Sequence, residues 1–86
     1  MFYVYILRSK KDGNLYIGYS KDLRRRLEEH NLGKSASTKP RIPFELIYYE
    51  AYKSQEDALK REHMLKIYQR TLGGLKRRLQ KSLRPD

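Results

Sequence analysis

Apolar and aromatic residues cluster in three short runs of the chain, at residues 3–7, 15–19 and 44–52. Each run has the length and the β-branched and aromatic content of a strand. The second and third runs are followed by segments in which apolar residues recur at helical spacing. The pattern therefore predicts two strands, a helix, a third strand and at least one further helix.

The first two strands are separated by an Asp-Gly pair at positions 12–13, which favours a two-residue type I′ hairpin turn. With that turn, Leu7 lies opposite Gly18. Because side chains alternate between the two faces of a strand, Tyr5 and Tyr16 then share a face with Gly18, which leaves space beside them. A loop longer by one residue would break this alignment.

The first helix is predicted between Ser20, a good N-cap residue, and Gly33, a residue that commonly ends helices. Helical periodicity places two polar side chains, Arg26 and His30, on the stripe of this helix that faces the sheet. The stripe therefore carries more than packing residues.

The second helix is predicted to begin at Ser54. Its apolar residues Ala58, Leu59 and Leu65 define one face, and Glu62 falls in the middle of that face. A carboxylate is thus expected on the inward side of this helix.

The order of elements, β-β-α-β-α-α, predicts an α+β fold with a small three-stranded antiparallel sheet flanked by helices. We expect residues 1–86 to form a single domain. Its core is expected over about 2–70, and a short basic helix over about 71–84.

The charge balance narrows the class of partner. Twenty Lys and Arg residues oppose ten Asp and Glu residues, which gives a formal net charge of +10. This excess favours a polyanionic partner, nucleic acid before an acidic membrane surface. The absence of Cys excludes a disulfide framework and a Cys-based zinc site and fits a reducing compartment. No apolar run approaches the roughly 20 residues of a membrane span, so we expect a cytoplasmic protein.

Five side chains able to do chemistry face the predicted interior: Tyr5, Tyr16, Arg26, His30 and Glu62. Buried charges are costly unless they are paired. One interpretation is therefore a closed Arg26–Glu62 ion pair with tyrosines packed around it. The other is an open cleft in which the same groups meet a phosphate and a metal ion. No zinc motif, P-loop or Ser-His-Asp arrangement competes with these interpretations.

At these positions the sequence resembles the GIY-YIG nuclease family. Residues 3–5 are similar to the first half-motif without its leading Gly, and residues 16–18 carry the second half-motif intact. Residues 21–30 resemble the helix signature, and residues 58–62 resemble the segment with the metal-binding carboxylate. Residues 38–48 are typical of the small single-domain bacterial branch. This branch is similar to the nuclease domain of structure-specific endonucleases.

The resemblance implies metal-dependent hydrolysis of a DNA phosphodiester and a role for each of the five residues. Tyr5 would be the general base toward the attacking water, with Tyr16 as its partner. Arg26 would bind the scissile phosphate, and His30 would hydrogen-bond a catalytic Tyr or relay its proton. Glu62 would hold one divalent ion, Mg²⁺ or Mn²⁺, which we expect to bind only together with DNA.

Other residues are candidates for contacts with the nucleic acid. Lys34, Lys39 and Arg41 lie in a basic loop that would position a phosphate backbone, although an ordinary solvated loop has the same composition. Four further tyrosines are expected to pack on the sheet rather than to stack on bases: Tyr3, Tyr48, Tyr49 and Tyr52.

The expected function is a metal-dependent DNA endonuclease acting on branched or damaged DNA, in DNA repair. The alternative is a non-catalytic basic module of the same fold that binds nucleic acid. A third hypothesis is an interaction subunit of a repair complex, and the aromatic third strand could support a homodimer.

Overall fold

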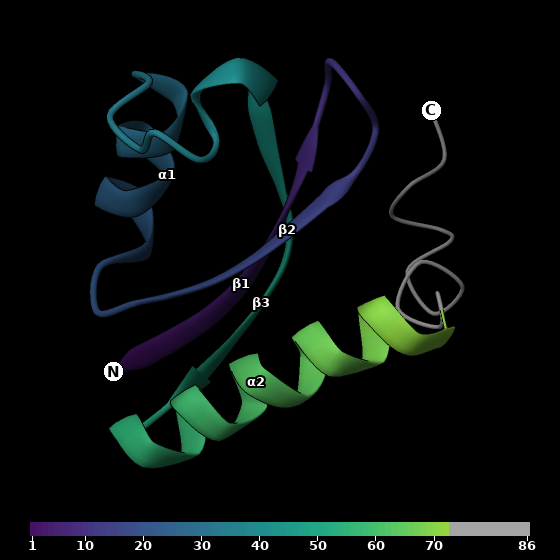
Figure 1. The fold of residues 1–86 in the computed structure, drawn as a ribbon. Helices are drawn as coiled ribbons and strands as arrows, with labels where there is room; N and C mark the ends of the chain where they lie inside the picture. The colour runs from purple at the N-terminus through teal and green to yellow at the C-terminus, as the bar shows by residue number, and fades with distance from the viewer. Residues whose placement is uncertain (73–86) are drawn as a thin grey trace.

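The computed structural model describes residues 1–72 and contains one antiparallel sheet (Figure 1). Its strands are β1 (Phe2–Ser9), β2 (Leu15–Ser20) and β3 (Phe44–Tyr52), in the spatial order β2-β1-β3. The central strand is therefore the first in the chain, and each neighbour pairs with it antiparallel. All three strands lie where the apolar runs predict them.

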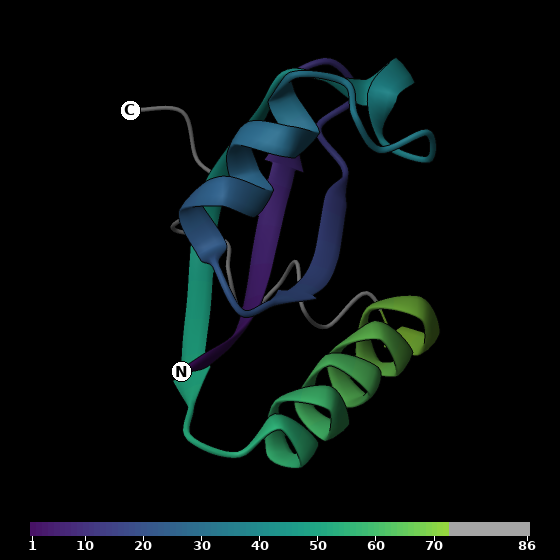
Figure 2. The ribbon, with the colours of Figure 1, turned by 90° about the vertical axis from the view of Figure 1, so that its left-hand side faces the viewer.

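The helices cover the two faces of this sheet (Figures 1 and 2). α1 (Leu23–Asn31) packs on the face that carries Tyr5 and Leu7, and α2 (Gln55–Leu72) packs on the opposite face. A short 3₁₀ turn, η1 (Lys39–Arg41), precedes β3. The α+β fold is thus confirmed. The basic helix expected over about 71–84 lies, apart from its first two positions, outside the described residues.

The hairpin loop between β1 and β2 is longer than expected, and the prediction of a two-residue turn was wrong. Leu7 lies opposite Tyr16, and Tyr5 lies opposite Gly18. The Ser9 hydroxyl accepts hydrogen bonds from two backbone N–H groups of the loop, each at 3.1 Å, and this holds the wider loop. Because the register moves by two residues, each side chain keeps the face that the sequence predicts.

The register places the Tyr5 ring directly over Gly18. A Cβ atom on Gly18 would lie 2.3 Å from both the Cζ atom and the hydroxyl oxygen of Tyr5, far inside van der Waals contact. Only glycine leaves room for the ring to cross β2. Tyr5 is 1% exposed as a result, although it carries a polar hydroxyl group.

α1 begins two residues later than expected. Asp22, not Ser20, is the N-cap, and its carboxylate accepts the backbone N–H of Arg25 at 3.1 Å. The Ser20 hydroxyl instead accepts the N–H of Asp22 at 3.0 Å, which orients the capping residue. The predicted end of the helix is confirmed, because Gly33 has a positive φ of 74° and donates its N–H to the carbonyl of His30 at 3.1 Å.

α2 begins as predicted, since the Ser54 hydroxyl accepts the backbone N–H of Asp57 at 3.2 Å. Ala58 and Leu65 are buried against the sheet. Leu59 is 43% exposed, so its predicted place on the buried face was wrong. Each step along a helix turns the side chain by about 100°, so Leu59, one position after Ala58, points away from the sheet. The helix therefore packs through a narrower row of residues than predicted.

A cluster around Glu50 fixes α2 to β3. The Arg61 guanidinium donates two hydrogen bonds to the Glu50 carboxylate, at 2.9 and 3.2 Å. The hydroxyl groups of Tyr48 and Tyr52 donate to the same carboxylate. Because Glu62 follows Arg61 directly, this cluster also sets the rotation of the helix that presents Glu62.

Gly18→Ala is expected to lower the free energy of unfolding by about 1–3 kcal/mol, because the new methyl group displaces the Tyr5 ring. Urea denaturation measures the change. In a Tyr5→Ala background the same substitution should cost less than about 0.5 kcal/mol, since the clashing ring is gone and alanine restricts the unfolded chain. An equal cost in the two backgrounds would contradict the steric explanation.

Candidate active site

Tyr5 and Tyr16 meet His30 on the face of the sheet that α1 covers. Their ring centroids lie 6.1 Å and 5.0 Å from the His30 ring, and 6.5 Å from each other. His30 is fully buried in the last turn of α1. Three of the five residues predicted from the sequence therefore form one contiguous cluster.

His30 connects the cluster to the loop beyond α1. Its Nε2 atom lies 3.1 Å from the Tyr5 hydroxyl oxygen, and its Nδ1 atom lies 2.8 Å from the Thr38 hydroxyl oxygen. Thr38 is fully buried as well, and its hydroxyl also lies 3.5 Å from the carbonyl of Ser35, to which it can donate. Both ring nitrogens of His30 thus have a partner.

The donors around His30 indicate which nitrogen carries its proton. If Thr38 donates to the Ser35 carbonyl, its oxygen accepts from His30 Nδ1–H. Arg26, which can only donate, lies within hydrogen-bonding reach of Tyr5, so the phenol oxygen accepts there and its own proton is free for Nε2. The favoured arrangement is a chain of donors from Tyr5 through His30 to Thr38.

Burial controls the protonation of this cluster. It raises the pKa of Tyr5 to about 12, although the neighbouring Arg26 guanidinium acts in the opposite direction. Burial likewise lowers the pKa of His30 below its usual value, and the positive charge of Arg26 adds to that effect. At neutral pH both groups are therefore held in their uncharged forms.

Arg26 and Glu62 do not form the closed ion pair that was one of the two interpretations of the sequence. The nearest carboxylate partner of Arg26 is Glu29, at 3.6 Å on the same helix. Glu62 pairs with Lys66 at 3.4 Å, and its side chain is 20% exposed. Glu62 nevertheless lies close enough to Tyr5 for its charge to raise the Tyr5 pKa.

The three basic residues of the loop before β3 differ in their surroundings. Lys34 and Lys39 lie in the loop without an ion pair to any residue from 1 to 72, and Lys39 is exposed. The Arg41 guanidinium instead forms an ion pair with Asp12 at 2.9 Å and lies 5.4 Å from the Phe44 ring centroid. These contacts bind the loop to the hairpin, so Arg41 has a structural role that the sequence did not indicate.

The described residues contain no group of three or more His, Asp or Glu side chains that could hold a metal ion by themselves. Glu62 is a lone, partly exposed carboxylate beside the tyrosine cluster. Mg²⁺ is commonly bound by one or two carboxylates that are supplemented by waters and substrate phosphates. The residues present fit such a shared site and do not fit a site built from protein ligands alone.

Sequence reasoning missed Thr38. It lies in a polar loop without periodicity, eight positions from the histidine that it contacts, and nothing in the order of residues distinguishes it from its neighbours. Glu29, which pairs with both Arg25 and Arg26, was also missed, because it looks like an ordinary surface residue of α1.

The chain is similar to a known family and to several known proteins. A family model described as the GIY-YIG catalytic domain matches residues 1–79. UPF0213 proteins of Staphylococcus aureus strains Mu3 and N315 are 48% identical to this chain over 69 residues, or 79% of this chain and 83% of theirs. The solution NMR structure of a UPF0213 protein from Bacillus halodurans is 39% identical. It covers 88% of this chain and 86% of its own, with a TM-score of 0.50.

Among residues 1–72, no helix is long and apolar enough to cross a membrane.

Thr38→Val should lower the free energy of unfolding by about 1–3 kcal/mol, because it leaves the buried Nδ1–H of His30 without an acceptor. Thr38→Ser, which keeps the hydroxyl, serves as the control. Nitrogen NMR of the His30 ring should show Nδ1 protonated in the wild type and in Thr38→Ser. A valine variant as stable as the serine variant, with an unchanged tautomer, would count against the proposed hydrogen-bond chain.

The lowered pKa of His30 predicts a pH dependence of stability. An unfolded histidine takes up a proton near pH ~6.5, whereas the folded protein resists protonation of His30. The free energy of unfolding should therefore fall as the pH drops below about 6.5, by at most about 1.4 kcal/mol per pH unit. Urea denaturation between about pH 7 and 5 measures this slope. It should disappear in His30→Asn and persist in His63→Asn, since His63 is exposed on α2.

Proposed function

The chain belongs to the GIY-YIG family, and on that premise we propose that it is a metal-dependent endonuclease that hydrolyses phosphodiester bonds in DNA. The observation that carries the proposal is the hydrogen bond between Tyr5 and His30 within the cluster, beside Arg26 and Glu62. Phosphodiester hydrolysis requires an activated water and neutralisation of the developing negative charge. This cluster offers groups for both requirements.

The water would be activated by a proton relay. With a pKa of about 12, Tyr5 stays protonated in the free protein and cannot act as a phenolate base. It can take the proton of the attacking water if it passes its own proton to His30 Nε2 in the same step. The new bond forms between the water oxygen and phosphorus, and the bond between phosphorus and the leaving oxygen breaks. The leaving oxygen takes up a proton from solvent, and the displaced proton rests on His30.

Arg26 would supply the positive charge. Its guanidinium reaches Tyr5 and pairs with Glu29 only through one longer contact of 3.6 Å. Its donors are thus available to a phosphate oxygen next to the attacking water. Bound phosphate would also offset the effect of Arg26 on His30 and make the imidazole a better proton acceptor when substrate is present.

Glu62 would hold a divalent ion, Mg²⁺ or Mn²⁺, together with phosphate oxygens of the substrate. Such an ion would supply charge neutralisation at the scissile phosphate. Lys34 and Lys39 would add contacts to the DNA backbone without reading its sequence. This arrangement supports a preference for the shape of a branched or damaged substrate.

The second candidate is a non-catalytic module that binds nucleic acid. One observation favours it: the raised pKa of Tyr5 keeps the phenol protonated in the free protein. Arg26 and the loop lysines would bind DNA equally well without a reaction. Cleavage assays separate the two candidates.

Glu62→Gln should slow metal-dependent cleavage about a hundredfold or more, because glutamine cannot supply the charge that holds the divalent ion. Nicked, flapped, junction and plain duplex DNA should be incubated with Mg²⁺, with Mn²⁺ and with chelator. Glu56→Gln is a matched control: Glu56 is an exposed glutamate on the same helix with a lysine partner four residues later, as Glu62 has. Its rate should stay within about twofold of the wild type.

Tyr5→Phe should reduce the rate by a similar factor in the same assay, since it removes the proton relay but keeps the ring over Gly18. Salt-sensitive binding to the whole panel without any cut product would instead assign the chain to the non-catalytic candidate.

A further inference from the structure

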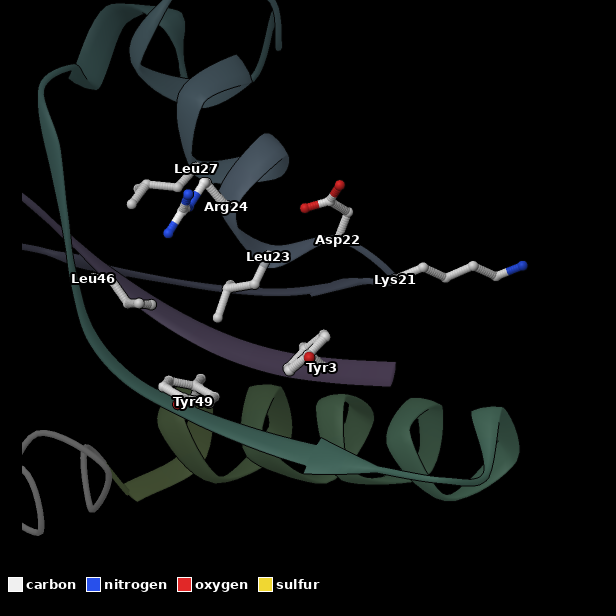
Figure 3. A pocket seen from close by; sticks show the side chains of 8 residues that line it. All are labelled: Tyr3, Lys21, Asp22, Leu23, Arg24, Leu27, Leu46 and Tyr49. Atoms are coloured by element: carbon white, nitrogen blue, oxygen red, sulfur yellow. The ribbon is translucent and has the colours of Figure 1, made fainter. Parts of the chain in front are cut away.

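A hollow lies on the same face of the sheet as the tyrosine cluster, beside α1 (Figure 3). The cluster lies over β1 and β2, whereas this hollow lies over β1 and β3. Its volume is about 520 Å³, within the range of small-ligand sites. Leu23, Leu27 and Leu46 form its apolar wall, and Tyr3 and Tyr49 form its floor.

One of the two tyrosines of this floor is more exposed than the sequence led us to expect for a sheet residue. Their ring centroids lie 6.1 Å apart at an interplanar angle of 61°, and Tyr49 is 54% exposed. An aromatic ring that is open on one face and fixed by a second ring at its edge offers a rigid stacking platform. Tyr49 packs against Tyr3 as expected for a sheet residue, and its exposed surface is in addition open to a ligand.

A positive charge accompanies the aromatic floor. Of the three consecutive arginines of α1, Arg25 and Arg26 form ion pairs with Glu29, whereas Arg24 forms none with any residue from 1 to 72. Figure 3 shows its guanidinium on the side of Leu46 and Tyr49.

The acidic residue at the rim of the hollow is already engaged, since the Asp22 carboxylate caps α1. Lys21 extends away from the aromatic pair (Figure 3), and its ammonium lies 5.8 Å from the ring centroid of Phe2, so Arg24 is the positive group that faces the hollow. The charged groups at the rim therefore favour an anionic ligand.

The combination points to a nucleotide with its base unstacked. A purely apolar ligand would not use the free guanidinium, and a phosphate alone would not use two tyrosines and three leucines. Proteins bind single-stranded nucleic acid with this pairing of aromatic platforms and basic side chains. A base inside a duplex is stacked on its neighbours and cannot enter such a hollow.

We propose that the hollow formed by Tyr3, Tyr49 and Arg24 binds an unpaired nucleobase and its phosphate beside the site of cleavage. The proposal rests on the proposed nuclease function, because the nucleobase would belong to the DNA substrate of that function. Tyr49 is the register partner of Tyr5 on the neighbouring strand, so their backbones lie about 4.8 Å apart. The cluster and the hollow therefore lie beside α1 on neighbouring strands of one sheet face, and a DNA strand bound at the cluster would present its adjoining nucleotides to the hollow. Such a hollow would select DNA with an unpaired stretch next to the cut.

Binding can be measured apart from cleavage, in chelator. The probe is a single-stranded oligodeoxynucleotide with one 2-aminopurine, whose fluorescence falls when it stacks on a ring, together with a fluorescein label for anisotropy. Tyr49→Leu should weaken binding about tenfold and abolish the 2-aminopurine quenching, because leucine keeps the apolar wall but cannot stack. Tyr49→Phe should keep both signals. Binding to blunt duplex should be the same in all three proteins.

Arg24→Gln and Arg25→Gln form a matched pair for the charge. Each removes one positive charge from neighbouring positions of α1, so any loss of general attraction is equal. Only Arg24→Gln should weaken binding to the single strand beyond its effect on duplex. The unpaired base could come from DNA or from RNA, and a ribonucleotide strand of the same sequence distinguishes the two. Equal quenching shows that the hollow binds a base of either nucleic acid, and weaker quenching with the ribonucleotide strand assigns the hollow to DNA.

Quenching that persists in Tyr49→Leu, or equal losses from the two arginine variants, would overturn the proposal. Thermal melting identifies a variant that has lost its fold, and Tyr3→Leu then provides an independent test of the same floor. The outcomes remain distinct from those of the cleavage assay: stacking without metal-dependent cleavage keeps the hollow and rejects the nuclease.

Discussion

The position of the Tyr5 ring over Gly18 is the constraint on which the candidate site depends. A side chain at position 18 would occupy the space of the phenol ring, so the ring could not cross β2. With glycine there, the Tyr5 hydroxyl reaches Nε2 of His30 at 3.1 Å and comes within the field of Arg26 and Glu62. One missing Cβ atom therefore allows groups from β1, α1 and α2 to act on one oxygen.

Each of those groups is held by an interaction outside the cluster. The glycine cap at Gly33 ends α1 just after His30, and the loop beyond it returns Thr38 to His30 Nδ1. On the other face, the paired hydrogen bonds from Arg61 to Glu50 fix the rotation of α2 and hence the direction of the next residue, Glu62. The network of buried partners leaves little conformational freedom to the side chains of the cluster, which favours a preorganised site.

Features that depend on periodicity were predictable from the sequence, whereas contacts between loops were not. The faces of Tyr5 and Tyr16 were predicted correctly although the hairpin register was wrong, because a shift by two residues preserves the alternation. The N-cap was misplaced because serine and aspartate both accept backbone hydrogen bonds, and two such residues stand two positions apart. The Arg41 ion pair with Asp12 joins segments 29 residues apart, a distance over which no local pattern carries information.

The electrostatics of the cluster suggest why its chemistry would depend on bound substrate. In the free protein, burial favours the uncharged forms of Tyr5 and His30, and Arg26 opposes any proton that arrives on the imidazole. A phosphate bound to Arg26 would cancel that opposition and bring the attacking water beside Tyr5. The same phosphate would also complete the oxygen ligands that Glu62 lacks among residues 1–72. Bound substrate would thus offset the charge of Arg26 and complete the metal site at Glu62 at the same time. Proton transfer would then become favourable only when a phosphodiester bond is in place.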